Sequence, residues 1–246
     1  MMDESRIFID ALHSDNKEAL RKISKSDKHN HVGLGYRLSR FSTFTGIVIP
    51  KAGIMHSIAE LDQYIKKWIA PHYKSPASFE FALNASLEEA KEDGVSLLEM
   101  SIDTLWMKSF NHQTEALFNT IGNVMQRVAD TMDFRPEIGI VRGVSPEMWE
   151  GELEQFFSSG LFRSIDLYGD EAASSVHKYK KYFRQAAHHG LKLKAHVGEF
   201  GTAEAIKEAV ETLELQEVQH GFAAATDKRI MRWLADNNIV LNICPT

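Results

Sequence analysis

The chain has 246 residues, of which 43% are hydrophobic and 25% are charged, and its formal net charge is −6 at pH 7. An α/β barrel of about 250 residues is routinely one domain, so we expect residues 1–246 to form a single domain. The acidic balance argues against a general nucleic-acid binder, whose surface is usually basic. No apolar stretch approaches the ~20 residues of a membrane span.

The N-terminus and the cysteine content bear on the cellular compartment. The first residues, MMDESRIFIDAL, include acidic side chains and lack a basic segment before an apolar run, unlike a secretory signal. Cys244 is the one cysteine, which excludes an internal disulfide and suits a reducing compartment. We therefore expect a cytoplasmic protein that binds neither nucleic acid nor membranes.

Taken in chain order, helical and strand-like segments alternate. An amphipathic helix is expected over Glu4–Ile23, and the first strand over Lys28–Val32. Further short apolar strands are expected at Ser96–Ser101, Glu137–Val141, Arg163–Leu167, Lys192–Val197, Glu217–Gln219 and Ile239–Ile243. The helices between them are expected at Ile58–Ile69, Phe79–Glu92, Gln113–Thr131, Val176–His189, Ala203–Leu213 and Asp227–Asn237.

Residues at the helix ends support this order. Thr202 and Thr226 stand where an N-cap is needed, and Gly94 and Gly190 stand where helices should end. Strands separated by helices favour right-handed βαβ units and a parallel sheet. Seven strands are predicted, whereas a closed barrel of this type needs eight. We expect an α/β, TIM-type (β/α)8 barrel lacking its last strand; the alternative is an open doubly wound sheet, although no GxGxxG follows an early strand.

Two histidines end the first predicted strand. Because residues two apart on a strand point to the same side, His29 and His31 can aim at one ion, and imidazole is a good zinc ligand. The simpler explanation is a pair of partly exposed histidines at a strand end, and a short motif alone does not decide between the two.

Two further predicted strands also end in a histidine. His196 falls at the end of the fifth predicted strand, with Glu199 in the loop that follows, and His220 ends the sixth strand before Gly221. In barrel enzymes the carboxyl ends of the strands carry the active site. A buried histidine with an exposed loop carboxylate, or an ordinary His-Gly turn, would explain each motif alone. Their recurrence at one end of three strands favours a shared site.

Several longer motifs carry a family resemblance. They are IDLYGDE at Ile165–Glu171, HVGE at His196–Glu199, QHG at Gln219–Gly221 and CPT at Cys244–Thr246, together with KHNH at Lys28–His31 and EDGVSLLEMSID at Glu92–Asp103. In order and approximate spacing they resemble the adenosine/AMP deaminase family of metal-dependent amidohydrolases, and the resemblance covers most of the chain. It implies zinc-dependent hydrolytic deamination of adenosine, AMP or a related aminopurine, with release of ammonia.

The resemblance also implies the ligands of one Zn²⁺ ion and the substrate contacts. His29, His31 and His196 would bind the zinc ion. Gly169 would hydrogen-bond the purine through its backbone, and His31 would also lie against the substrate. The partner is therefore expected to be a small purine nucleoside or nucleotide.

Two residues are implied in proton handling. Glu199 would handle the proton on a ring nitrogen, and His220 would orient or deprotonate the metal-bound water. This agrees with general chemistry, because a carboxyl held protonated in a desolvated pocket can donate to the ring nitrogen. The other zinc deaminase chemistry, with one histidine and two cysteines as ligands, is excluded by the single cysteine.

The sequence departs from the family pattern at two places. The family commonly continues its first motif as HxHLDG, whereas this chain reads His31-Val32-Gly33-Leu34-Gly35 and lacks the aspartate that contacts the sugar. The family's later Asp-Asp pair, whose first member binds zinc, has no equivalent before Thr246. We therefore expect an open barrel edge that promotes self-association. Two alternatives remain: another metal-dependent amidohydrolase, or a catalytically inactive binding protein.

Overall fold

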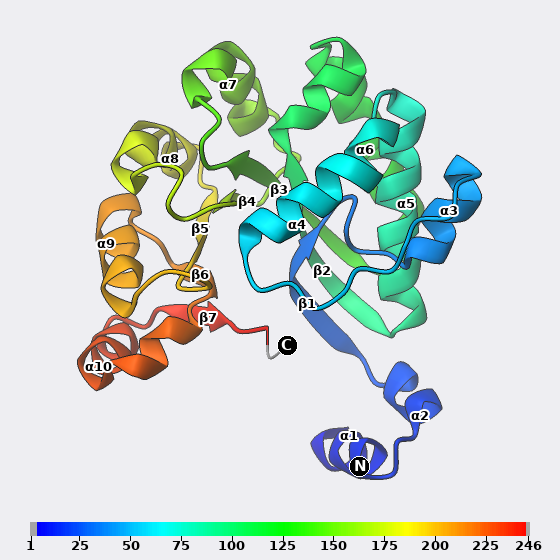
Figure 1. The fold of residues 1–246 in the computed structure, drawn as a ribbon, viewed down its shortest axis with the longest axis horizontal. Helices are drawn as coiled ribbons and strands as arrows, with labels where there is room; N and C mark the ends of the chain where they lie inside the picture. The colour runs from blue at the N-terminus through cyan, green and yellow to red at the C-terminus, as the bar shows by residue number, and fades with distance from the viewer. Residues whose placement is uncertain (1–3, 245–246) are drawn as a thin grey trace.

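The computed structural model describes residues 4–244, and seven parallel strands form its centre. The sheet order is β1-β2-β3-β4-β5-β6-β7, so each strand pairs with the next along the chain. The strands are β1 (Lys25–His31), β2 (Val95–Asp103), β3 (Asp133–Val141), β4 (Ser164–Tyr168), β5 (Lys192–Val197), β6 (Glu217–His220) and β7 (Val240–Asn242). The expected TIM-type barrel without its last strand is confirmed: the sheet curves round and no pairing joins β7 to β1 within residues 4–244 (Figure 1).

Helices follow the strands and cover the outside of the barrel (Figure 1). The α-helices are α1 (Glu4–His13), α2 (Lys17–Lys22), α3 (Leu38–Thr45), α4 (Ile58–Tyr64), α5 (Pro76–Glu92), α6 (Thr114–Val128), α7 (Glu150–Ser158), α8 (Lys180–His188), α9 (Ala203–Leu213) and α10 (Lys228–Asp236). A π-helix, η1 (Ile65–Ile69), continues α4, and 3-10 turns fill shorter stretches: η2 (Ala70–His72), η3 (Thr104–Phe110), η4 (Pro146–Trp149), η5 (Val176–Tyr179) and η6 (Phe222–Thr226). Among the described residues, no helix combines the length and apolarity needed to cross a bilayer.

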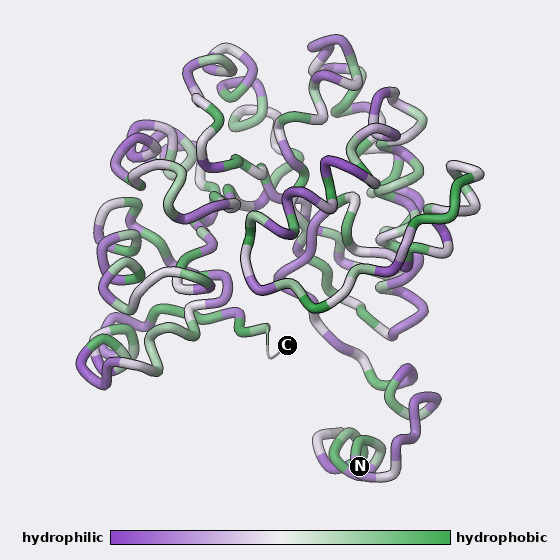
Figure 2. The backbone as a smooth tube through the Cα atoms, in the orientation of Figure 1, coloured by the Kyte–Doolittle hydropathy of each residue, from purple (hydrophilic) through white to green (hydrophobic). Residues whose placement is uncertain are grey.

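The main core lies between the sheet and its helices. Leu98 and Ile138 are fully buried on β2 and β3, and Phe183 and Ile206 are fully buried on α8 and α9. Burying a side chain of this size contributes about 1.5–3 kcal/mol each. Figure 2 shows hydrophobic stretches along the central strands and hydrophilic ones in many outer turns. This core holds the carboxyl ends of the strands at fixed places around one mouth.

The N-terminal region differs from the prediction of one long helix. Two helices, α1 and α2, flank a turn in which Asp15 has a φ of 48°. The side chain of Asn16 then accepts a hydrogen bond from the amide of Ala19 and caps α2. A short polar residue that bonds its own backbone competes with a continuous helix, which explains the break. Both helices lie apart from the barrel, joined to it through β1 (Figure 1).

The capping predictions are partly correct. Thr202 accepts from the amide of Ala205 and caps α9, and Gly94 and Gly190 adopt positive φ values after α5 and α8. Thr226 is not an N-cap, because it lies inside η6 and Asp227 caps α10 by accepting from the amide of Arg229. An aspartate is at least as good a cap as threonine, so the adjacent residue takes the role.

Candidate active site

The first strand presents both of its histidines to the barrel mouth. The pairing of β1 with β2 shifts between Asp27 and Asn30, where β1 holds one residue more than its partner. An extra residue of this kind bends a strand and re-aims its side chains. Asp27 accepts from the amide of His29 at 3.0 Å, and the side chain of Asn30 accepts from the amide of His31 at 2.8 Å. Asp27, before the two histidines, and Asn30, between them, therefore hold the local backbone that directs both rings.

The fifth strand places His196 opposite β1, where a neighbouring strand orients it. His196 Nδ1 lies 3.1 Å from Asp166 Oδ1 on β4, and Asp166 Oδ2 accepts from the hydroxyl of Ser101 at 2.6 Å. All three side chains are buried. Burial raises the pKa of Asp166, but His196, His31 and the Ser101 hydroxyl outweigh this effect and hold the pKa below its usual range. The ionised carboxylate requires a proton on Nδ1, which leaves Nε2 of His196 with a free lone pair.

Three imidazole nitrogens converge at the mouth. Nε2 of His196 lies 2.8 Å from Nε2 of His29 and 3.0 Å from Nε2 of His31. Burial, followed by the neighbouring His196, lowers the pKa of both His29 and His31 to about 3. Neutral rings at these distances direct lone pairs at one point, an arrangement that a cation stabilises. The three histidines thus form a set of ligand atoms of the kind that zinc prefers.

The sixth strand adds His220 beside this set. Its ring centroid lies 4.5 Å from that of His29 and 5.2 Å from that of His196. His220 has a φ of 66°, a left-handed conformation that costs a non-glycine residue roughly 1–3 kcal/mol and is concentrated at functional sites. Burial and His196 lower its pKa to about 4, so the ring is neutral at pH 7.

Glu199 reaches His220 from the loop after β5. Its Oε2 lies 3.3 Å from His220 Nε2. Burial raises the pKa of Glu199; His196 partly opposes this, and the Glu171 carboxylate adds to it. A half-buried carboxyl with a raised pKa is suited to donating a proton at neutral pH.

Gly169 directly follows β4 at the same mouth. Its φ of 99° lies in a region that side chains rarely adopt, so glycine suits this turn. The preceding Tyr168 packs its ring 4.7 Å from the ring of His31. The five side chains and one glycine that the sequence singled out therefore lie around one opening.

Cys244 reaches the site from the chain end. Its Sγ lies 3.1 Å from Nδ1 of His29, which is the ring nitrogen that does not take part in the convergence of Nε2 atoms. The other two residues of the predicted CPT motif, Pro245 and Thr246, lie outside the described residues. Within residues 4–244, no carboxylate joins the ligand atoms of His29, His31 and His196.

Sequence reasoning missed the residues that support this site. Asp166, Glu171 and Ser101 lay within predicted motifs but received no role. A signal was present for Asp166, because an aspartate flanked by Ile165 and Leu167 in a buried strand needs a polar partner. No such signal existed for Ser101, since its partner on β4 is distant in the sequence.

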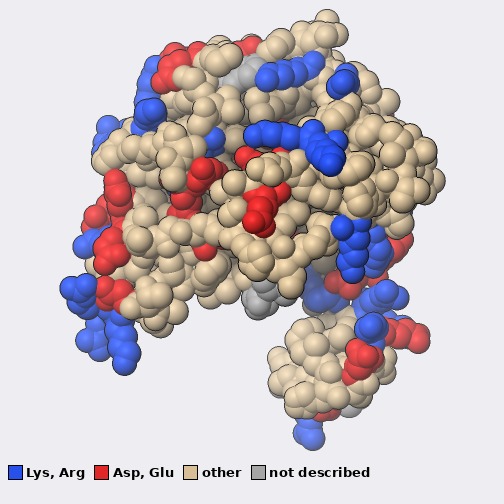
Figure 3. All heavy atoms as spheres, in the orientation of Figure 1, with Lys and Arg blue, Asp and Glu red and all other residues tan. Residues whose placement is uncertain are grey.

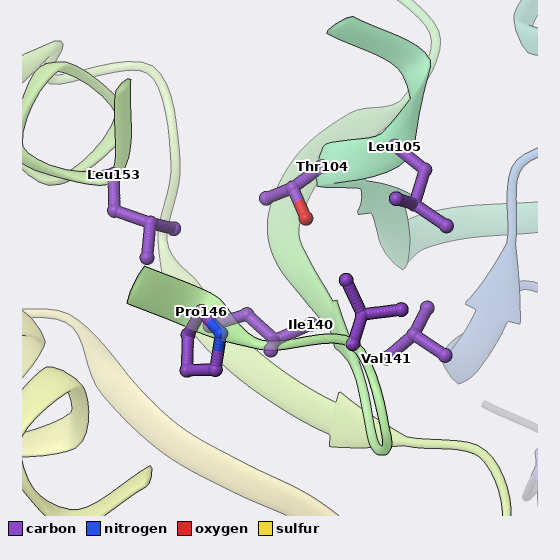
Figure 4. Close-up of a pocket in the computed structure, with 7 residues that line it drawn as sticks. Thr104, Leu105, Ile140, Val141, Pro146 and Leu153 are labelled. Atoms are coloured by element: carbon purple, nitrogen blue, oxygen red, sulfur yellow. The ribbon is translucent and has the colours of Figure 1, made fainter. Parts of the chain in front are cut away.

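A separate cavity does not belong to this site. It is about 10 Å³ in size and is lined by Thr104, Leu105, Ile140, Val141, Val144, Pro146 and Leu153 (Figure 4). A volume near that of one water molecule and an apolar lining exclude it as a purine pocket. The outer surface carries mixed charge: Figure 3 shows basic and acidic side chains interspersed on one face, without a continuous basic patch.

Comparisons with known proteins identify the family of this chain. The family model described as adenosine deaminase matches residues 45–246. A putative adenosine/adenine deaminase of Treponema pallidum is 31% identical over 230 residues, covering 93% of this chain and 77% of that protein.

Solved structures share the fold. An adenine deaminase from Arthrobacter aurescens superposes with a TM-score of 0.74 at 23% identity, over 89% of this chain and 71% of that one. An amidohydrolase from Burkholderia ambifaria, with bound Zn, superposes with a TM-score of 0.74 at 18% identity, over 91% of this chain and 66% of that one. The family match spans most of the sequence, and the T. pallidum relative is covered over more than two thirds of its length. This chain therefore belongs to the adenosine deaminase family of hydrolases.

Proposed function

We propose that this chain catalyses the zinc-dependent hydrolytic deamination of adenosine, AMP or a related aminopurine, with release of ammonia. The observation that carries the proposal is the convergence of three imidazole Nε2 atoms, with His196 2.8 Å from His29 and 3.0 Å from His31. Glu199 and His220 lie beside them at 3.3 Å from each other. A metal-ligand set next to a proton-transfer pair suits hydrolysis by an activated water.

His29, His31 and His196 are proposed to hold the zinc ion. The donor set fits, because neutral imidazoles are zinc ligands and the Asp166 carboxylate fixes the His196 tautomer that exposes Nε2. When bound, zinc lowers the pKa of water towards 7 and so supplies hydroxide at neutral pH. The zinc in the B. ambifaria amidohydrolase supports the choice of metal.

The chain's own residues then perform the proton transfers. Protonated Glu199, whose pKa is raised by burial, donates to a ring nitrogen and makes the carbon bearing the amino group more electrophilic. Neutral His220 orients the attacking water or accepts its proton. Gly169 and His31 are proposed to bind the purine: Gly169 through its backbone, and His31 through the ring that packs against Tyr168. After hydroxide adds to the activated carbon, the proton accepted by His220 would pass to the amino group, which leaves as ammonia, and the proton of the new hydroxyl would return to Glu199.

Adenine, adenosine and AMP are the substrates to compare. Gly33 stands where the family has its sugar-contacting aspartate, and its φ is 97°. A Cβ built at Gly33 would lie 2.9 Å from the ring of Tyr73, so an aspartate has no room there. The names of the T. pallidum and A. aurescens proteins, adenosine/adenine deaminase and adenine deaminase, make the free base the first compound to test.

Turnover and metal content of single variants test the proposal. We expect Glu199→Gln and His220→Ala each to lower the rate of ammonia release ~10²–10⁴-fold with little change in zinc content, because neither is a proposed ligand. His177→Ala, which removes an exposed histidine paired with Glu208, is the matched control. Near-normal turnover in both site variants, with normal turnover in His177→Ala, would contradict the proposal.

We also propose that the open edge of the barrel pairs with a second copy of the chain. Within residues 4–244, the outer edges of β1 and β7 pair with no other strand, and unpaired strand edges invite pairing. Val240 and Ile243 near that edge are 45% and 56% exposed. Sedimentation should show a dimer that Val240→Lys weakens; a monomer at every concentration would contradict this.

A further inference from the structure

A carboxylate next to the site binds the loop that carries Glu199. Both oxygens of Glu171 face the backbone of residues 198–201 after β5. Oε2 accepts from the amide of Gly198 at 2.9 Å, and Oε1 accepts from the amides of Glu199, Phe200 and Gly201 at 3.0, 3.0 and 3.1 Å. Four consecutive N–H groups that point at one anion form a nest, a strong anchor for a turn.

Two glycines of this loop stand at positions where a side chain would collide with its neighbours. A Cβ at Gly201 would lie 2.5 Å from Glu171 Oε2, so a side chain there would push the carboxylate away. Gly198 has a φ of 73°, and a Cβ there would meet Ile206 at 2.5 Å. In the sequence HVGEFG, Gly201 thus leaves room for the Glu171 carboxylate, and Gly198 allows close packing against α9.

Arg142 ties the backbone of Glu171 to the backbone of His196. Its Nη1 donates to the carbonyl of Glu171 at 3.1 Å, and its Nη2 donates to the carbonyl of His196 at 3.3 Å. Arg142 is only 6% exposed, so its guanidinium is buried beside these two carbonyls. The buried Arg142 side chain therefore links the backbone at Glu171 to the carboxyl end of β5.

We propose that Glu171 is a positioning residue, which holds the loop so that Glu199 meets the ring nitrogen of the substrate. This inference rests on the proposed function, because it assigns the proton transfer to Glu199. Glu171 itself is not a catalytic residue. A carboxylate has about four lone-pair sites, and four backbone N–H groups already occupy this one.

The placement matters because Glu199 is otherwise held weakly. Among the described residues, the polar side-chain partner of its carboxylate is His220 at 3.3 Å, and Glu199 lies on a loop rather than on a strand. A displacement near 1 Å from a change far from the chemistry can lower turnover about 100-fold. The Glu171 carboxylate holds the backbone amide of Glu199 itself. Loss of Glu171 therefore frees Glu199, the residue proposed to transfer the proton.

Three variants of the whole chain test this inference. Glu171→Ala removes all four acceptor bonds, Glu171→Gln keeps one oxygen that can accept up to three of them, and Asp170→Asn changes the neighbouring carboxylate. Asp170 accepts only from the amide of Ala172 within its own segment, which makes it the matched control. The measurements are amide hydrogen exchange at residues 198–201, kcat and KM, zinc content, and the pH profile of kcat.

We expect Glu171→Ala to speed exchange at these amides and to lower kcat on the order of 100-fold, with KM and zinc content little changed. Glu171→Gln should recover part of this loss. It should also move the alkaline limb of the kcat profile to lower pH, since the Glu171 charge raises the pKa of Glu199. A purely structural role would not move that limb. Asp170→Asn should behave as the parent chain.

The outcomes separate the two proposals. If the parent chain releases no ammonia from any aminopurine, the proposed function fails, and amide exchange in the Gln and Ala variants still decides whether Glu171 holds the loop. Unchanged exchange at residues 198–201 in both variants would overturn the inference. An equal loss of kcat in Asp170→Asn, or kcat within about twofold of the parent in Glu171→Ala, would overturn it as well. If Glu171→Ala does not fold, Glu171→Gln carries the test.

Discussion

Two clusters of buried polar side chains lie inside this barrel, and they differ in how their charges are matched. Below the mouth, Lys194 contacts Glu137 at 2.6 Å, Glu217 at 3.5 Å and also Glu99. Lys28 and Lys192 add cations to Glu217, and Arg135 adds one to Glu99. Every carboxylate of this ionic layer therefore has a cation. At the mouth, three imidazoles converge and the described residues supply no cation among them.

The pKa directions show the same contrast. Burial alone would lower the pKa of Lys194, but Glu137 and Glu99 outweigh it and raise the pKa. Burial and the neighbouring His196 lower the pKa of His29 and His31 to about 3, and the Asp166 carboxylate offsets this only in part. A buried cluster that is complete by itself contributes to folding, whereas one that is complete only with an added cation points to binding. The comparison therefore assigns stability to the ionic layer and function to the histidines.

The largest effect, on the free energy of unfolding, is expected when the ionic layer is broken. Lys194→Met leaves three buried carboxylates without their shared cation, and we expect the free energy of unfolding to fall by about 3–5 kcal/mol. Lys22→Met is the matched control, because Lys22 and its partner Glu18 are 73% and 80% exposed and an exposed pair contributes less than about 1 kcal/mol. Urea denaturation measures both. A loss below about 1 kcal/mol in Lys194→Met would show that the layer is not structural.

The next effect concerns pH and the metal-free chain. An unfolded histidine titrates near 6.5, whereas folded His29 and His31 titrate near 3, so the unfolded chain binds more protons between these values. The free energy of unfolding should therefore fall as pH falls below about 6.5, by up to about 1.4 kcal/mol per pH unit for each imidazole kept neutral. Denaturation between pH 7 and 5 measures this. His31→Gln should reduce the slope; an unchanged slope would contradict the account.

A smaller effect sharpens the role of Asp166. Asp166→Asn keeps the size of the side chain but removes the charge that fixes the His196 tautomer. Loss of such a carboxylate partner typically costs 10–100-fold in metal affinity, so we expect zinc binding to weaken by that factor. Zinc titration monitored by calorimetry measures the change. Asp133→Asn, an exposed aspartate paired with Arg135, should leave the affinity unaltered.

Much of the fold was predictable because the signals are local. Strands of apolar residues separated by capped helices indicate a parallel barrel, and Thr202 and Gly190 do act at helix ends. The break after His13 was missed, although Ser14, Asp15 and Asn16 are turn and cap residues. β3 also begins at Asp133 rather than Glu137, because residues 133–136 already pair with residues 97–100 of β2.

The support of the site could not be predicted in the same way. The His-x-His spacing and the strand ends place His29, His31 and His196 together because geometry follows directly from strand period. Lys194 alternates with Lys192 as in a solvent-facing pattern, and its burial depends on carboxylates from three other strands. Likewise, the partners of Glu171 are backbone amides of a loop 27 to 30 residues later, so no local pattern indicates its role. Such partners are set by the curvature of the sheet, which brings distant strands together.

The most direct test of the histidine cluster is anomalous scattering at the zinc edge from crystals grown with zinc. The account predicts one strong peak, within ~2.0–2.1 Å of Nε2 of His29, His31 and His196. The same peak should persist in Lys194→Arg and disappear in His196→Ala. A zinc peak away from these three nitrogens, or none at saturating zinc, would contradict the claim that the barrel mouth is a metal site.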